Sequence, residues 1–180
     1  MSDIVLTVIG DDRPGLVDAL AGAVAAAGGS WNRSQMSRLG GKFAGIAVVS
    51  LDADRADDLD RHLDPIRTSG LLQITVSRPS DDGGAGPDPA DERFLALQLV
   101  GADRPGIVSE VAGVLAAHAV SIVELESATS NAPMSGELLF EASLVLSAPP
   151  SLATDTLQRA LEEIANELMV DIELDGSAAQ

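Results

Sequence analysis

The stretch GDDRPGL, Gly10–Leu16, decides the fold, because it occurs again as GADRPGI at Gly101–Ile107. Over eight aligned positions that start at the first glycine of each copy, six residues are identical. Each copy follows a short apolar run of the kind that forms β-strands, Ile4–Ile9 and Phe94–Val100. A loop rich in glycine and proline, repeated at matched places, indicates that the chain contains two copies of one domain.

Between the copies lies SDDGGAGPDPADE, 80–92, which has no apolar residue larger than alanine or proline. A segment with so little to bury is typical of a flexible linker. We therefore expect one domain at 1–79, a second at 93–176 and a short tail at 177–180.

The apolar periodicity after the loops predicts the same order of elements, βαββαβ, in both halves. Apolar residues recur at i, i+1, i+4 and i+8 after each loop, as expected for the buried stripe of a helix. These residues are Leu16, Val17, Leu20 and Val24 in one half, and Ile107, Val108, Val111 and Leu115 in the other. The further elements expected are hairpins at 30–51 and 121–146, helices at 55–64 and 152–168, and last strands at 71–77 and 169–174. This order predicts an α+β, ferredoxin-like fold, an antiparallel sheet with two helices on one face, in each half.

Local signals suggest how the helices begin and end. Asp12 and Asp103 are expected as N-caps, and Pro14 and Pro105 in the first helical turn, where a missing N–H costs little. Pro65 is expected to end or kink the second helix.

Composition limits the function classes. The chain has 28 acidic and 11 basic residues, a formal charge of −17, and a single lysine, Lys42. Binding to nucleic acid or to an anionic membrane needs clustered Lys and Arg, so neither is expected. The absence of cysteine excludes disulfides and thiol catalysis, and no signal peptide or membrane span is evident. We expect a soluble, cytoplasmic protein.

The repeated loop has two interpretations. In the first, it is a strand-to-helix turn and nothing more. In the second, the free amides at the helix N-terminus bind a carboxylate, which can approach closely because Gly15 and Gly106 have no side chain. Asp12 or Asp103 would then receive an ammonium, so that the two groups together fit an α-amino acid. A phosphate-binding loop is rejected, because Leu16 stands where that motif needs lysine.

A strand followed by D-R-P-G-[LI]-V and an amphipathic helix, twice in one chain, resembles a tandem ACT-domain protein. The stretches QMSRLGGKFAGIAVVSL, 35–51, and VSIVELESATSNAPMSGELLFEASLVLS, 120–147, narrow the resemblance to the glycine cleavage system transcriptional repressor family. The resemblance covers nearly the whole chain apart from the linker and the tail.

This resemblance implies that the two domains pair within the chain and bind a small amino acid, with glycine or serine favoured, where the loop of one domain faces the second strand of another. Many members have asparagine at the loop and at the strand start, where this chain has aspartate and serine. The implied ligand residues are Asp12, Arg13, Pro14, Gly15, Leu16 and Ser30, and Asp103, Arg104, Pro105, Gly106, Ile107 and Ser121. It further implies a regulator that acts through a protein partner, such as a transcription factor or an enzyme, and that can form a homodimer.

Two other functions stay open: a ligand-free interaction scaffold with the same fold, and an enzyme. Few residues are of the types that commonly catalyse reactions or bind metals, and no catalytic residue, metal or cofactor is expected. His62 lies in an acidic helical segment with arginines among the carboxylates, which is typical of a solvated face. His118 is expected at a helix end, and Trp31 in the core or at a domain contact.

Overall fold

The computed structural model describes residues 2–78, 93–132 and 137–176. The chain divides into two compact units, Met1–Gly84 and Ala85–Gln180, which we call repeat 1 and repeat 2 and describe separately. Three expected segments lie outside the described residues: the linker at 80–92, the tail at 177–180, and residues 133–136 of the second hairpin loop.

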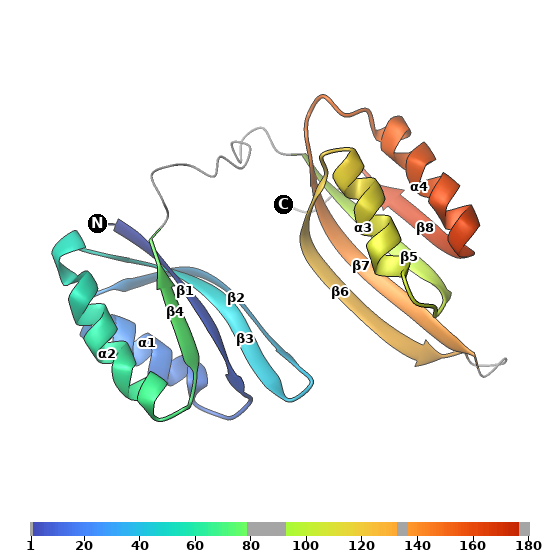
Figure 1. The fold of residues 1–180 in the computed structure, drawn as a ribbon. Helices are drawn as coiled ribbons and strands as arrows, with labels where there is room; N and C mark the ends of the chain where they lie inside the picture. Colours follow the sequence, from blue (N-terminus) through green and yellow to red (C-terminus); the bar gives the residue numbers. More distant parts are fainter. Residues whose placement is uncertain (1, 79–92, 133–136, 177–180) are drawn as a thin grey trace. The chain divides into compact units, whose positions relative to one another are not determined.

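Both repeats have the expected order of elements, shown in Figure 1. The elements of repeat 1 are β1 (Ser2–Asp11), α1 (Leu16–Ala26), β2 (Ser30–Leu39), β3 (Lys42–Leu51), a 3-10 turn (Ala53–Arg55), α2 (Ala56–Thr68) and β4 (Gln73–Ser77). Those of repeat 2 are β5 (Arg93–Ala102), α3 (Ile107–Ala117), β6 (Ser121–Asn131), β7 (Leu138–Ala148), α4 (Thr154–Leu168) and β8 (Val170–Asp175).

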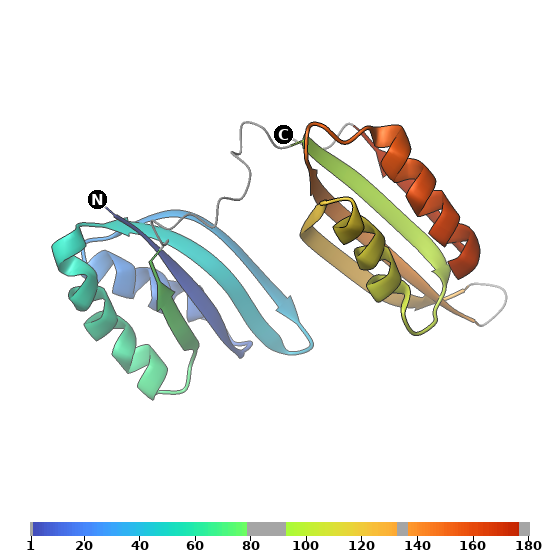
Figure 2. The ribbon, with the colours of Figure 1, turned by 45° about the horizontal axis from the view of Figure 1, so that its top comes forward.

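Each repeat forms one antiparallel four-stranded sheet. The strand order is β2-β3-β1-β4 in repeat 1 and β6-β7-β5-β8 in repeat 2. The two helices of each repeat cover one face of its sheet, as Figure 1 and Figure 2 show. In the described part of each repeat, no helix covers the opposite face. The expected ferredoxin-like fold is confirmed.

The cores are aliphatic, because alternate strand residues and one stripe of each helix turn toward the space between sheet and helices. The largest fully buried side chains in both repeats are leucines. They are Leu6, Leu20, Leu51, Leu59, Leu63 and Leu72 in repeat 1, and Leu95, Leu97, Leu99, Leu115, Leu146 and Leu157 in repeat 2.

The expected N-caps were wrong. Gly15 and Gly106 occupy the N-cap positions, with φ of 92° and 102°, and neither helix has a side-chain cap hydrogen bond. A side chain in this left-handed region costs about 1–2 kcal/mol, which explains glycine here. Pro14 and Pro105 therefore lie in the turn that precedes each helix, and not in its first turn.

The expected end of the second helix at Pro65 was also wrong. Helix α2 continues through Pro65 to Thr68, and the Ser69 amide donates to the Pro65 carbonyl at 3.1 Å. Pro65 is exposed and lies in the last turns of α2. Because proline has no N–H, one carbonyl of the preceding turn loses its helical hydrogen bond, and that carbonyl lies at the surface.

Candidate functional site

Each repeated loop is fastened to the hairpin of its own repeat. The Asp12 amide donates to the Gly41 carbonyl at 2.9 Å, and the Asp103 amide donates to the Leu138 carbonyl at 2.8 Å. These bonds hold the loop against the end of the β2–β3 or β6–β7 hairpin. The loop is therefore a defined surface at one end of each sheet.

The helix that follows each loop begins with open amides. The Ala19 amide donates to the Gly15 carbonyl at 2.9 Å, and the Glu110 amide donates to the Gly106 carbonyl at the same distance. The amides before these residues in the first turn have no carbonyl one turn earlier to accept from them, and no side chain caps them. Partial positive charge at these amides favours an anion, such as a carboxylate.

The two loop aspartates differ in their surroundings. Asp12 Oδ2 accepts a hydrogen bond from Arg38 Nη1 at 3.2 Å. At the position of Arg38, repeat 2 has Thr129, since Arg38 pairs with Phe43 and Thr129 with the matching Phe140. The Asp103 carboxylate therefore faces no arginine from this strand position and is the better acceptor for a ligand ammonium.

A pocket of about 440 Å³ opens beside the loop of repeat 2. This volume lies in the range of small-molecule sites, about 300–1,000 Å³. Its lining residues are Asp103, Arg104, Gly106, Ile107, Val108, Ser109 and Phe140. The pocket thus contains one carboxylate and one guanidinium beside the open amides of α3.

Arg104 lines this pocket. Its Nε atom is buried and has no hydrogen-bond partner in the described part of the chain. Guanidinium groups bind carboxylates through paired N–H groups. The pocket can therefore complement both ends of a zwitterion: Asp103 for the ammonium, and Arg104 with the α3 amides for the carboxylate.

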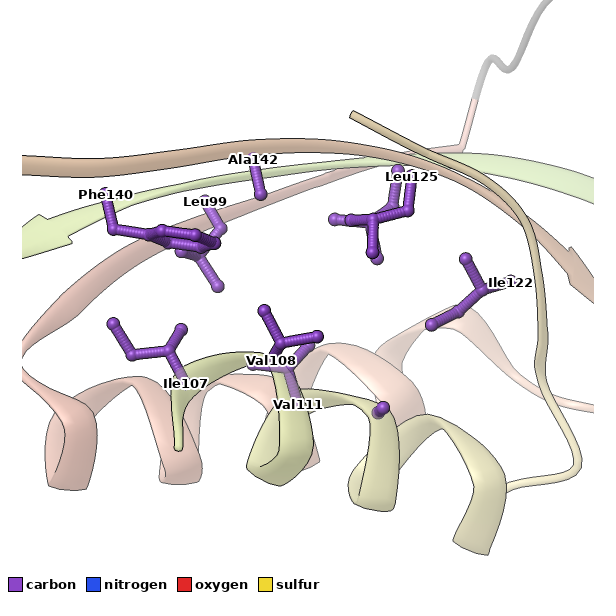
Figure 3. A pocket seen from close by; sticks show the side chains of 10 residues that line it. Leu99, Ile107, Val108, Val111, Ile122, Leu125, Phe140 and Ala142 are labelled. Carbon is purple, nitrogen blue, oxygen red and sulfur yellow. The ribbon is translucent and has the colours of Figure 1, made fainter. Parts of the chain in front are cut away.

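An apolar crevice adjoins the loop pocket and runs between α3 and the sheet (Figure 3). Figure 3 shows Ile107, Val108 and Val111 pointing from the helix toward Leu99, Phe140 and Ala142 of the sheet. The crevice and the loop pocket share Ile107, Val108 and Phe140. The free space in the crevice is only about 10 Å³, so it forms an apolar wall and not a second ligand chamber.

Repeat 1 fills the corresponding region differently. Trp31, at the position of Ile122, packs against the core of repeat 1, which confirms core packing for the sole tryptophan. Its indole N–H donates to Ser34 Oγ at 3.2 Å, and Ser34 stands at the position of Leu125. The two repeats therefore differ beside their loops although the loops are nearly identical.

The strand-start serines lie far from the loop of their own repeat. Ser30 pairs with Ser50 at one end of the sheet, whereas the loop follows Asp11, which pairs with Lys42 at the other end. Ten strand residues span roughly 30 Å. Ser121 occupies the same place in repeat 2, opposite Ser147. A single repeat therefore does not bring the predicted loop and strand residues together.

Sequence reasoning missed polar groups at both ends of repeat 1. At the strand start, Asn32 Nδ2 donates to Ser50 Oγ and to Asp3 Oδ1, the latter at 3.4 Å. At the loop end it missed Arg38, whose pairing with Asp12 depends on the register of β2 against β3. An isolated Asn or Arg in an exposed strand gives no signal until that register is known.

Charge is concentrated where β1 enters the loop of repeat 1. Lys42 donates a hydrogen bond to the Asp11 carboxylate, and this bond together with the charge of Lys42 lowers the pKa of Asp11 below its ordinary value. The charge of Arg13 acts in the same direction. Asp11 therefore stays ionised and occupied by Lys42, which makes it a weaker candidate for ligand binding than Asp103.

Neither histidine lines the loop pocket. His118 is the C-cap residue of α3, and its Nδ1 lies 2.9 Å from the Val114 carbonyl. His62 is exposed on α2. Across the residues that the structure describes, no group of three or more His, Asp or Glu side chains could hold a metal ion.

The repeated fold and its loops define a class of protein with two ACT domains. The sequence profile of the ACT domain family matches residues 2–77 and 93–175, which cover most of the chain. The chain belongs to the ACT domain family.

Individual relatives are similar over nearly the full chain. The glycine cleavage system transcriptional repressor of Escherichia coli (strain K12) is 25% identical over 166 residues, which cover 92% of this chain and 85% of the repressor. The crystal structure of an unknown protein from Galdieria sulphuraria superposes with a TM-score of 0.84 and 34% identity, covering 98% of this chain and 99% of that chain.

A further crystal structure, of a candidate glycine cleavage system transcriptional repressor, shares the fold with a TM-score of 0.71 and 16% identity. The superposition covers 97% of this chain and 96% of that chain. In the part of the chain that the structure describes, no helix is long and apolar enough to cross a membrane.

Proposed function

We propose that the chain is a non-enzymatic regulatory protein in which repeat 2 binds a small amino acid and a protein partner responds to the bound state. The observation that carries the proposal is the loop pocket of repeat 2. In this pocket the Asp103 carboxylate, the Arg104 guanidinium and the open amides of α3 surround a volume of about 440 Å³. Membership of the ACT family and similarity to a transcriptional repressor support a regulatory role.

The proposed ligand is an α-amino acid with a small side chain. Its ammonium would bind Asp103, and its carboxylate would bind Arg104 and the amides at the start of α3. The wall of Ile107, Val108 and Phe140 is apolar, and the crevice behind it is too narrow to receive a large side chain. Similarity to the glycine cleavage system transcriptional repressor makes glycine and serine the favoured ligands in this proposal.

We further propose that the pocket is completed by the strand start of another ACT domain. Within one repeat, Ser121 lies at the far end of the sheet from Asp103, so the two can join in one site only across domains. The long strands β2 and β6 lie at the edges of their sheets, where a strand of another domain could pair with them. The second domain would come from a second copy of the chain in a homodimer.

The proposal is tested by thermal denaturation in the presence of each of the twenty amino acids. A ligand that binds the folded state raises apparent stability by RT ln(1 + [L]/Kd), about 2.7 kcal/mol at a hundredfold excess over Kd. We expect glycine or serine to stabilise the wild-type chain and the Asp12→Asn variant, but not Asp103→Asn. The two variants lose the same charge from equivalent loops. A response that survives in Asp103→Asn would place the ligand elsewhere.

A ligand-free scaffold is the second candidate, and one observation favours it. The loop of repeat 1 is already occupied, because Asp12 binds Arg38. If repeat 2 were also indifferent to all amino acids while a protein partner still bound, the chain would be a constitutive interaction module.

A further inference from the structure

The uncovered face of the repeat 2 sheet has an unusual charge pattern. Leu95, Leu97 and Leu99 of β5 are buried toward the helices, so the alternate residues of this strand lie on the other face. The register of β5 with its neighbours extends this face to β7, β6 and β8. We call it the outer face of repeat 2.

Carboxylates line both edges of the outer face, strands β6 and β8, and one more lies between them on β7. Ala96 pairs with Val145 and Asp175, and Val145 pairs with Glu124. The outward residues of the neighbouring strands pair in the same way along the rest of β5. Every ionisable side chain at these outward positions of the four strands is acidic. These carboxylates belong to Glu124 and Glu126 on β6, Glu141 on β7, and Asp171, Glu173 and Asp175 on β8.

The floor between the edges is mostly uncharged. It contains the half-buried Ala96 and Val145, Val100, which is 40% exposed, and the exposed Glu141, which pairs with Val100. Ser143 Oγ donates to Gln98 Oε1 at 2.8 Å, so this polar pair satisfies part of its hydrogen bonding across the strands. The face thus combines acidic margins with a floor of apolar side chains, one uncharged polar pair and one carboxylate, Glu141.

Repeat 1 shows that the fold does not require these carboxylates. The same register places Arg33, Gln35, Ala44, Gln73, Thr75 and Ser77 at the six matching positions of its outer face. None of these residues is acidic, and one is basic. Like charges two residues apart on one strand repel each other, so the carboxylates of repeat 2 cost stability that repeat 1 avoids.

Three kinds of occupant do not fit this face. Nucleic acid and anionic membrane would be repelled by it. A shared metal ion does not fit either, because no cluster of three or more ligands lies among the described residues. The complementary surface has positive charge on two sides of a stripe that meets the apolar side chains of the floor, and a basic amphipathic helix offers such a surface.

The dimensions agree with a helix. Strands β6 and β8 are separated by three strand spacings, about 14 Å, and a helix with its side chains is about 10–12 Å across. A helix that lies on the floor along the strands would place its Lys or Arg residues beside Glu126 on one edge and Glu173 on the other. The same fold already covers the opposite face of this sheet with two helices of its own (Figure 2).

We propose that the outer face of repeat 2 is the docking surface for a basic amphipathic helix of a partner protein. The inference rests on the proposed function only in supposing a protein partner, and it does not require that an amino acid binds. It therefore can fail or hold independently of the amino-acid response.

The test is a titration of the full chain, without amino acid, against a labelled synthetic helix of leucine and lysine with one apolar stripe. A peptide of the same composition with its leucines dispersed around the helix is the matched probe. We expect the amphipathic peptide to bind and the dispersed peptide to bind much more weakly. Equal binding of the two peptides, or no binding, would overturn the proposal.

Two variants with equal charge change locate the contact. One combines Glu126→Gln, Asp171→Asn and Glu173→Gln on the outer face. The other combines Glu162→Gln, Glu163→Gln and Glu167→Gln, which are exposed on α4 of the same repeat. The outer-face variant should weaken binding by at least about tenfold, and the α4 variant by much less. Equal loss in both would mean that net charge alone attracts the peptide, and the proposal would fail.

The floor is tested by Val100→Thr, which keeps the shape and strand preference of the side chain but adds a hydroxyl. Peptide binding should weaken while the melting temperature stays close to that of the wild type. Unchanged affinity would contradict docking on the apolar floor.

Discussion

Arg38 Nη1 donates a hydrogen bond of 3.2 Å to Asp12 Oδ2, and Thr129 takes the place of Arg38 in repeat 2. Two loops with nearly the same sequence therefore present different charges to a ligand. The loop of repeat 1 carries an aspartate that is already paired, and the loop of repeat 2 carries one that faces a pocket together with Arg104.

Removing Arg38 should release the loop of repeat 1. The ion pair is exposed, with 72% of the arginine side chain accessible, so Arg38→Gln should change the unfolding free energy by less than about 1 kcal/mol. The freed Asp12 should then accept an ammonium, and calorimetric titration with glycine or serine should show two bound molecules per chain in place of one. Arg33→Gln, on the same exposed strand, is the control and should keep one. An unchanged stoichiometry in Arg38→Gln would show that the ion pair does not control the loop.

Two glycines of repeat 2 should respond to alanine in opposite directions. Gly106 has φ of 102°, so Gly106→Ala should destabilise the chain by about 1–2 kcal/mol. Gly113 lies inside α3, where an added methyl group would meet no other part of the chain within 4 Å, so Gly113→Ala should stabilise by about 0.5–1 kcal/mol. Urea denaturation measures both. A stabilising Gly106→Ala would contradict the left-handed N-cap.

The core of repeat 1 can be tested through its own tryptophan. Leu6 is fully buried, and Leu6→Ala should lower stability by about 2–5 kcal/mol in an unfolding curve followed by Trp31 fluorescence. Leu39 is 82% exposed at the hairpin end, and Leu39→Ala should leave the same curve nearly unchanged. Similar losses in both variants would contradict the assignment of the core.

The Asp11–Lys42 pair should contribute stability that depends on pH. Because Lys42 lowers the pKa of Asp11 in the folded state, the contribution is present above the ordinary pKa of aspartate and is lost as the pH falls through the folded value. Lys42→Gln should therefore be less stable than the wild type at neutral pH, and the difference should vanish in strong acid. Lys42→Arg keeps the cation and should resemble the wild type. A difference that persists unchanged in acid would assign it to packing.

The fold could be predicted because the sequence features that specify it are local and occur in both repeats. The repeated loop and the stripe from Leu16 to Val24 define the strand, turn and helix of each repeat before any contact between distant residues is known. The N-cap was missed because Asp12 resembles a capping residue in sequence, whereas the D-R-P-G turn places the left-handed glycine at the helix start. Pro65 misled in a similar way, since a proline in the exposed last turns does not stop a helix.

The candidate site could be predicted only in part, because its electrostatics depend on strand register. The loop residues were found, but the pairing of Asp12 with Arg38 and its absence at Thr129 follow from how β2 and β6 align with their neighbours. The acidic outer face depends on a bulge between Ile122 and Glu124. Simple alternation would place these two residues on one face, and the bulge separates them.

Amino-acid binding at the loop of repeat 2 underlies the proposed function, and amide NMR observes it at the residues concerned. In a titration of the ¹⁵N-labelled chain with glycine or serine, we predict saturable shifts at the amides of Gly106, Ile107 and Val108, and their loss in Asp103→Asn. Shifts confined to the loop of repeat 1, or no saturable shift with any amino acid, would contradict binding at this loop.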